Sequence, residues 1–118
     1  MSLMSSVFGK QENPDKVTPT SVDGAQAVRM VAEGAQLVDV REKDEWNSGH
    51  AAVAVHIPLG TIATAGPRRL KKNAPVVAVC ASGMRSKQAA SVLREAGYSV
   101  ANLKGGMGSW VRAGGKMA

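Results

Sequence analysis

Cysteine, aromatic residues and long apolar runs are all scarce in this chain of 118 residues, and each scarcity excludes a class of protein. Because Cys80 is the single cysteine, the chain can form no internal disulfide and needs no oxidising compartment. No apolar run approaches the length of a membrane-spanning helix. The first residues also lack the long apolar segment of a signal peptide, so we expect a cytoplasmic protein without a membrane partner.

The aromatic side chains are only Phe8, Trp46, Tyr98 and Trp110. So few aromatics exclude a platform on which unpaired bases could stack, as binders of single-stranded nucleic acid need. The formal net charge is +6, but the basic residues are spread along the chain and only residues 68–72 form a dense cluster. We interpret that cluster as a solvated surface with no nucleic-acid partner, and we note that a general positive field attracts small anions.

Helical periodicity and short apolar runs alternate along most of the chain. Residues 1–16 are polar and broken by Pro14, so we expect a flexible tail there and one compact domain over residues 17–118. The expected helices cover 18–34, 41–46, 86–96 and part of 105–114, and the expected strands cover 35–40, part of 51–60, 74–80 and 98–103. This alternation predicts an α/β fold with a parallel sheet and helices on both of its faces.

The first expected helix, over residues 18–34, has sequence signals at both ends. Thr18 or Ser21 can cap its start, and Gly34 can end it. Its apolar positions recur at helical spacing and are Ala25, Val28 and Ala32. We therefore expect this set of side chains to face the core.

Functional side chains are expected where the strands end. The strand over 74–80 is apolar on both faces, which predicts a central place in the sheet, and it ends on Cys80. In parallel sheets the chemistry lies beyond the carboxyl ends of the strands. Asp39 ends another expected strand, and the turn at Gly105 and Gly106 follows a third, where we expect the backbone to pass close to the cysteine loop.

The segment after Cys80 predicts a reactive cysteine. Gly83 allows a tight turn, and the N–H groups of such a turn can converge on one point beside the positive end of the following helix. Arg85 adds a positive charge nearby. We therefore expect a pKa for Cys80 substantially below ~8.5 and interpret the residue as a nucleophile; the alternative is a small apolar core residue.

Three ordered segments resemble the rhodanese-like single-domain sulfurtransferase family. LVDVREKDEWNSGH (37–50) is similar to the first signature of that family, CASGMRS (80–86) to its catalytic loop, and GYSVANLKGGMGSW (97–110) to its closing segment. Their order and spacing agree with the family over residues 17–115. The resemblance implies a rhodanese fold, a five-stranded parallel sheet flanked by helices on both faces, and no metal or organic cofactor.

The resemblance also implies roles for individual residues. Cys80 would accept a sulfane sulfur from a small anionic donor such as thiosulfate, as a persulfide, and pass it to cyanide or to a thiol. Arg85 and the amides of the loop would stabilise the donor and the persulfide. Asp39 and Arg41 would support the loop, with Ser86 as a partner of Asp39. The donor-binding residues would be Ala81, Ser82, Gly83, Met84 and Ser86.

Other positions of the resembling segments are expected to be structural. The resemblance makes His50 a structural histidine and not a general base, and Trp46 and Trp110 are expected to anchor the core. The chain departs from the family pattern after His50, where Ala52 and Val53 replace the usual Pro and Gly. This departure concerns the turn after His50 and a partner surface, not the nucleophile.

Three other readings of the cysteine loop stay open. Tyrosine-phosphatase-like and arsenate-reducing enzymes place five residues between cysteine and arginine, whereas only residues 81–84 separate Cys80 from Arg85 here. A rhodanese-like binding module, or a module that delivers sulfur to a relay protein, would use the same pocket to recognise a protein partner. Thioredoxin-like exchange is disfavoured because no second cysteine is present to resolve a mixed disulfide.

Overall fold

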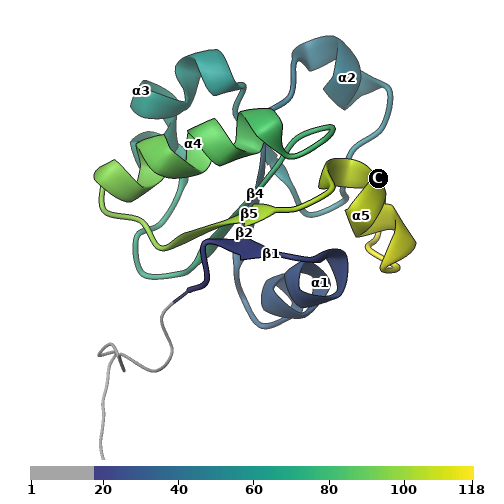
Figure 1. Ribbon diagram of the computed structural model, residues 1–118. Coiled ribbons are helices and arrows are strands. Elements are labelled where there is room, and N and C mark those ends of the chain that lie inside the picture. Colours follow the sequence, from purple (N-terminus) through teal and green to yellow (C-terminus); the bar gives the residue numbers. More distant parts are fainter. Residues whose placement is uncertain (1–17) are drawn as a thin grey trace, which may run out of the picture.

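A five-stranded parallel sheet forms the centre of the computed structural model, which describes residues 18–118 (Figure 1). The strands are β1 (Ser21–Val22), β2 (Gln36–Asp39), β3 (Val55–His56), β4 (Val76–Val79) and β5 (Val100–Leu103). Their order across the sheet is β1-β5-β4-β2-β3, and every neighbouring pair is parallel. The expected α/β class and rhodanese-like sheet are confirmed. The expected tail, residues 1–16, lies outside the described residues.

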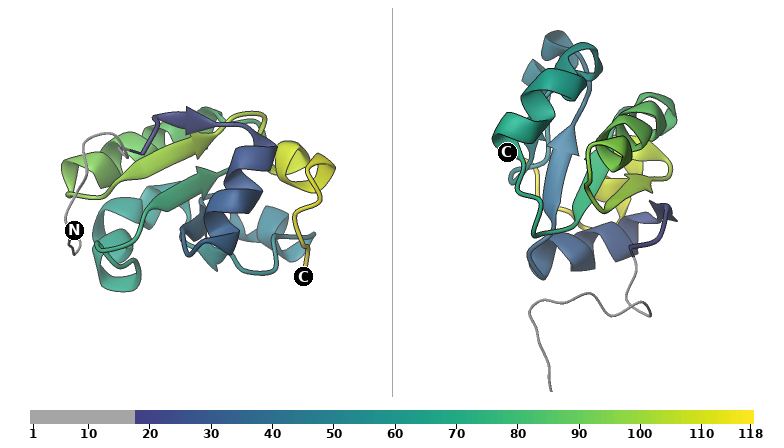
Figure 2. Two further views of the ribbon diagram at one scale, coloured as in Figure 1. Left: turned by 90° about the horizontal axis from the view of Figure 1, so that it is seen from below. Right: turned by 90° about the vertical axis from the view of Figure 1, so that its left-hand side faces the viewer.

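Helices cover both faces of the sheet. They are α1 (Gly24–Ala32), α2 (Lys43–Asn47), α3 (Ile62–Arg69), α4 (Met84–Glu95) and α5 (Gly106–Arg112), with a short 3₁₀ helix, η3, at Leu59–Thr61. The two further views show α1 on the opposite side of the sheet from α3 and α4 (Figure 2). Among residues 18–118, no helix combines the length and the apolar character needed to cross a membrane.

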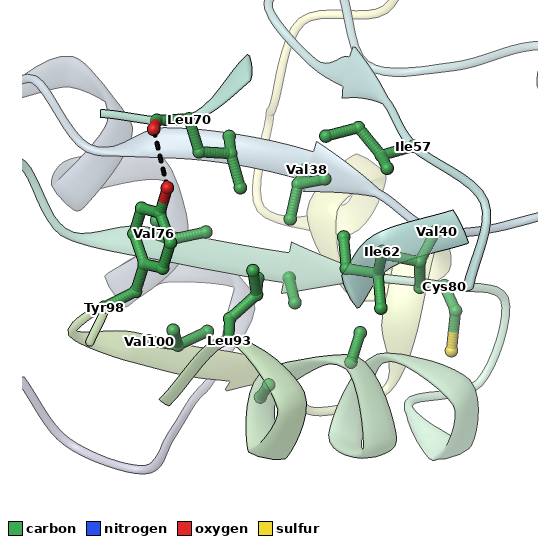
Figure 3. Close-up of a cluster of buried hydrophobic side chains, with 13 residues drawn as sticks. Val38, Val40, Ile57, Ile62, Leu70, Val76, Cys80, Leu93, Tyr98 and Val100 are labelled. Carbon is green, nitrogen blue, oxygen red and sulfur yellow. Dashed lines mark hydrogen bonds between the residues drawn. The ribbon is translucent and has the colours of Figure 1, made fainter. Parts of the chain in front are cut away.

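The core is divided by the sheet into two clusters of buried side chains. Successive residues of a strand point to opposite faces, so Val76 and Ala78 of β4 pack on the α3–α4 side while Val77 and Val79 pack on the α1–α5 side. Figure 3 shows the first cluster, in which the Tyr98 hydroxyl donates a hydrogen bond to the Leu70 carbonyl at 2.7 Å. The central place predicted for the strand over 74–80 is confirmed, because β4 lies between β5 and β2.

The first helix begins later than the sequence predicted. Neither Thr18 nor Ser21 caps α1; the cap is Asp23, whose carboxylate accepts a hydrogen bond from the Gln26 backbone N–H at 2.8 Å. The Gln26 side chain in turn accepts from the Asp23 backbone N–H, which completes a capping box. Ser21 instead belongs to β1, which pairs with β5 at the edge of the sheet. The predicted stop is confirmed, since α1 ends at Ala32 and Gly34 follows with a φ of 111°.

The apolar face predicted for this helix is also wrong in part. Ala25 and Ala32 are exposed, whereas the buried positions of α1 are Gly24 and Ala27. Gly24 is buried because α1 packs directly on α5: a Cβ atom there would clash with the backbone oxygen of Ser109. The closest contact of α1 with α5 is therefore made by glycine, the smallest residue. A search for periodic apolar side chains does not identify such a contact.

The segment between β2 and β4 differs most from expectation. The strand expected within 51–60 is only the two-residue β3, and the following helix α3 was not predicted, because its sequence IATAGPRR contains Gly, Pro and Thr, which are poor helix formers. The dense basic cluster over 68–72 lies at the end of α3 and just beyond it. The helix expected over 41–46 forms at Lys43–Asn47, and the elements expected from 74 onward are confirmed within a few residues.

Candidate active site

Cys80 lies directly after β4, at the start of a short loop that enters α4. The side chain is fully buried, and its sulfur points toward the N-terminal end of α4 (Figure 3). Gly83, the last residue before the helix, has a left-handed φ of 106°, which allows its backbone N–H to turn back and donate to the Cys80 sulfur at 3.0 Å. The loop therefore encloses the sulfur from the helix side.

A second backbone segment passes close to the cysteine loop, as the glycine pair predicted. The Met107 N–H donates to the Cys80 carbonyl at 2.8 Å, which ties the start of α5 to the loop. At Gly106 a Cβ atom would clash with the backbone of Ala81. This close approach requires glycine, and it fixes the position of the loop from the sheet side.

The pKa of the Cys80 thiol lies below its ordinary value. Burial by itself raises this pKa, because a thiolate loses hydration in the interior. The opposing and larger effect comes from hydrogen bonds to the sulfur, first from the Ser86 hydroxyl, whose oxygen is 3.3 Å away, and then from backbone N–H groups of Ser86, Gly83 and Ser82. Hydrogen bonds from the loop and from the first turn of α4 are thus together the reason that the thiolate is favoured.

Arg85 is held by a carboxylate that the sequence analysis did not single out. Glu45 of α2 binds it through two hydrogen bonds, Nη1 to Oε1 at 2.7 Å and Nη2 to Oε2 at 2.9 Å. This pairing lowers the pKa of Glu45 to about 2 and raises the pKa of Arg85 above its ordinary value. Part of the Arg85 charge is therefore neutralised, and the residue connects α2 to the cysteine loop. The sequence signal was an acidic residue in the helix that follows a strand ending on Asp39.

Asp39 and Arg41 form a buried ion pair at the end of β2. Arg41 donates to both carboxylate oxygens, from Nε at 3.0 Å and 3.1 Å and from Nη2 at 2.8 Å, and its Nη2 also donates to the Gly49 carbonyl at 2.7 Å. The pair thereby holds both ends of the segment that carries α2, and so the position of Glu45. Among the described residues, neither side chain makes a hydrogen bond to the cysteine loop, so the expected support of the loop by this pair stays a prediction.

Ser86 does not pair with Asp39, so that expectation is wrong. Its hydroxyl lies between two acceptors, the Cys80 sulfur at 3.3 Å and the side-chain oxygen of Asn102 in β5 at 2.5 Å, and its one hydrogen is donated to one of them at a time. Asn102 is a further residue that the sequence analysis missed; it is buried, with 8 % of its surface exposed. The sequence feature that could have indicated Asn102 is that it is the one polar residue in the otherwise apolar strand β5.

His50 and His56 stack on Trp46 and make structural hydrogen bonds. The ring centroids of Trp46 and His50 are 3.5 Å apart and those of Trp46 and His56 are 4.7 Å apart. His50 Nδ1 is 2.8 Å from the Trp46 carbonyl, and His56 Nε2 is 2.8 Å from the Arg41 carbonyl. The structural role expected for His50 fits this geometry. Trp110 is a core residue, whereas Trp46 is half-buried and packs on the two histidines.

The surface beside the cysteine loop is hollowed at the start of α4. Ala81 and Ser82 are exposed, and Met84 is 74 % exposed even though its side chain is apolar. An open cavity of about 380 Å³ lies next to the loop and is lined by Met84, Arg85, Lys87, Gln88 and Ser91. A molecule in this cavity would contact the Arg85 guanidinium and the apolar Met84 side chain, whereas Cys80 is fully buried and does not line the cavity. Residues 18–118 contain no cluster of three His, Cys, Asp or Glu side chains that could hold a metal ion.

Comparison with known proteins identifies relatives of this arrangement. The family model of the rhodanese-like domain matches residues 23–113. The chain is 35 % identical over 86 residues to the thiosulfate sulfurtransferase GlpE of Pseudomonas entomophila, covering 72 % of this chain and 78 % of that protein. It is 31 % identical over 100 residues to the "Putative sulfur carrier protein YrkF" of Bacillus subtilis, covering 84 % of this chain but only 54 % of that protein.

A solved structure shares the whole architecture. The solution structure of the rhodanese-like domain of the Alr3790 protein from Anabaena sp. superposes with a TM-score of 0.76 at 26 % identity. The match covers 85 % of this chain and 79 % of that domain.

Proposed function

This chain belongs to the rhodanese-like domain family, and we propose that it is a sulfurtransferase in which Cys80 carries the transferred sulfur. The observation that supports this most strongly is the environment of the Cys80 sulfur. Cys80 is the single cysteine of the chain and lies directly after the central strand β4. Its sulfur accepts hydrogen bonds that lower the pKa of the thiol. Such an environment favours the thiolate, which is the nucleophilic form of cysteine.

The proposed first step is attack of the Cys80 thiolate on the outer sulfur of an anionic donor such as thiosulfate. A bond forms between the cysteine sulfur and the outer sulfur, the sulfur–sulfur bond of thiosulfate breaks, and sulfite leaves with the bonding electron pair. Cys80 then carries a persulfide anion. The N–H groups of Ser82, Gly83 and Ser86 converge on this region and stabilise its negative charge.

The proposed second step returns the enzyme to its starting state. A cyanide ion or a thiolate attacks the outer sulfur of the persulfide, the bond between the two sulfurs breaks, and the Cys80 thiolate leaves. Cyanide becomes thiocyanate, and a thiol acceptor becomes a persulfide. No electron acceptor or metal is needed in either step, because the sulfur is transferred at a constant oxidation level.

The acceptor in the cell is proposed to be a protein thiol of a sulfur relay. Two observations support this: Met84 is exposed beside the loop, and a relative is named as a sulfur carrier. We place the protein in the cytoplasm, where a reducing environment keeps an active-site cysteine free. Phosphoryl transfer is the competing reaction of a cysteine loop, and the four residues between Cys80 and Arg85 leave less room for a tetrahedral oxyanion.

The test is a side-by-side assay of sulfur transfer from thiosulfate to cyanide and of hydrolysis of p-nitrophenyl phosphate. We expect thiocyanate formation by the native chain, none by Cys80→Ser, and no phosphatase activity. A variant at a surface position, Arg68→Gln, is the control for handling and folding. Phosphatase turnover that disappears in Cys80→Ser, without sulfur transfer, would replace this proposal with the phosphatase reading.

A further inference from the structure

A second cleft lies between α4 and the β1–β5 edge of the sheet, on the far side of Ser86 from the cysteine. Its volume is about 410 Å³, and all the residues that line it have polar side chains. Lys87, Ser91 and Arg94 line it from α4, where their spacing places them on one helical face. Thr20 and Ser21 line it from the β1 edge. Figure 1 shows α4 alongside β5, with β1 at the outer edge of the sheet.

Three cations meet in this cleft without a carboxylate. They are Lys87, Arg94 and Lys104, which follows β5. Over residues 18–118 the ion pairs are those of Arg41 and Arg85, so no described carboxylate pairs with these three groups. Arg94 is held in place, because its Nη2 donates to the carbonyls of Thr20 at 3.2 Å and Val100 at 3.0 Å. Positive charges that line one cleft repel one another, and a bound anion would relieve that repulsion.

Asn102, which also lines the cleft, carries a buried side-chain donor. More than nine-tenths of its surface is buried, and its side-chain oxygen accepts a hydrogen bond from the Ser86 hydroxyl. Its side-chain nitrogen, Nδ2, has no acceptor within the described part of the chain. A buried N–H without a partner is costly, and an anion in the cleft would supply the missing acceptor.

We propose that this cleft binds a small oxyanion of the phosphate or sulfate type, and that Asn102 and Ser86 connect its occupancy to Cys80. A tetrahedral oxyanion offers several acceptor oxygens in different directions, which matches cations and hydroxyl groups that approach from α4, β1 and β5. The link to the active site is short: Asn102 accepts from the Ser86 hydroxyl at 2.5 Å, and that hydroxyl oxygen lies 3.3 Å from the Cys80 sulfur. The site goes beyond the proposed sulfurtransferase function and does not depend on it.

Occupancy is expected to make the thiolate less favourable. Lys87, Arg94 and Lys104 contribute positive potential that favours the thiolate, and Arg85 is already paired with Glu45 of α2, so an anion in the cleft cancels part of that potential. A single charge within about 10 Å of the thiol raises its pKa by roughly half a unit. We therefore expect iodoacetamide to alkylate Cys80 about threefold more slowly near neutral pH when the cleft is occupied.

The binding test is a titration of the full ¹⁵N-labelled chain with inorganic phosphate, with chloride at matched ionic strength as the reference. We expect saturable shifts of the amide signals of Ser91, Asn102 and Lys104. Lys104→Gln should weaken phosphate binding several-fold, and Arg68→Gln, which removes the same charge from the end of α3, should not. Because no sulfur transfer is measured, this test succeeds or fails independently of the proposed enzymatic function.

Two results would overturn the anion site: the absence of saturable shifts, or shifts confined to the cysteine loop that persist in Lys104→Gln. The coupling is tested by the alkylation rate of the native chain and of Lys104→Gln with and without phosphate. We expect phosphate to slow the alkylation of Cys80 in the native chain and to have little effect on the alkylation rate of Lys104→Gln. Saturable phosphate binding in the cleft together with an unchanged alkylation rate would support the anion site and overturn its connection to Cys80.

Discussion

At the scale of single residues, reactivity depends on which groups donate hydrogen bonds to the Cys80 sulfur. The Ser86 hydroxyl is the foremost of them, at 3.3 Å, and backbone N–H groups supply the rest. Arg85, which the loop sequence marks as the obvious source of positive charge, gives two of its N–H groups to Glu45. The hydroxyl and the amides therefore account for the lowered pKa, and the role we propose for Arg85 is to orient the loop and the donor.

Replacing Ser86 by alanine tests this division of roles. Ser86→Ala removes one donor from the thiolate, so the pKa of Cys80 should rise by about half a unit to one unit. The pH profile of alkylation should shift to higher pH by the same amount. The matched control is Ser82→Ala, because Ser82 reaches the sulfur through its backbone N–H while its side chain is exposed. An identical pH profile for native protein and Ser86→Ala would show that the amides act alone.

At the scale of elements, the junction between the cysteine loop and α4 depends on one backbone conformation. Gly83→Ala places a side chain at a φ of 106°, which costs about 1 kcal/mol of stability, and should displace the N–H that binds the sulfur. Gly34, with a φ of 111° and open space around its Cα, is the matched control far from the site. Urea denaturation should show similar losses for Gly83→Ala and Gly34→Ala, but only Gly83→Ala should slow alkylation. Equal alkylation rates in the two variants would contradict the role of the loop.

The ion pair between Glu45 of α2 and Arg85 of α4 should make the stability of the fold depend on pH. The pKa of Glu45 is lowered to about 2 in the folded chain, mainly by Arg85, from an ordinary value of 4.5. A lowered pKa stabilises the fold at pH values above the unfolded pKa, and this contribution is lost as the pH falls through the folded pKa. The native chain should therefore be more stable than Glu45→Gln near neutral pH, and the difference should shrink between about pH 5 and about pH 2. Urea denaturation across this range measures it, and a constant difference would contradict the pairing.

Some helices and strands of this fold could be predicted from the sequence, and others could not. The strand before Cys80 and the helix after it were predictable, because a continuous apolar run and a glycine stop are local signals. The start of α1 was not, since Ser21 can cap a helix as well as Asp23 can, and the pairing of β1 with β5 decided between them. Helix α3 was missed because tertiary packing overrides its poor helix-forming residues.

The contacts of the site depend on residues distant in sequence, and for this reason they escaped prediction. Glu45 lies 40 positions from Arg85, and Asn102 lies 16 positions from Ser86. Each contact requires α2 or β5 to be placed against α4 first. The residues of the loop itself were found because their chemistry is contained within seven consecutive positions, 80–86.

At the scale of the whole molecule, the net charge of +6 should affect how an anionic donor arrives. A positive field raises the encounter rate with anions, and salt screens it over about 10 Å at ~0.1 M ionic strength. The value of kcat/KM for thiosulfate should therefore fall a few-fold between about 10 mM and about 150 mM potassium chloride. Alkylation by iodoacetamide, which is neutral, is the control and should change little. A salt-independent kcat/KM would show that the field plays no part in donor capture.

The central claim, that Cys80 carries the sulfur, is tested most directly by the intact mass of the full chain after incubation with thiosulfate and removal of excess reagent. The account predicts a gain of one sulfur atom in the native protein, its removal by cyanide, and no gain in Cys80→Ser. The chain offers no other cysteine that could hold the sulfur, so the variant gives an unambiguous comparison. An unchanged mass of the native protein, or a sulfur adduct that persists in Cys80→Ser, would contradict the account.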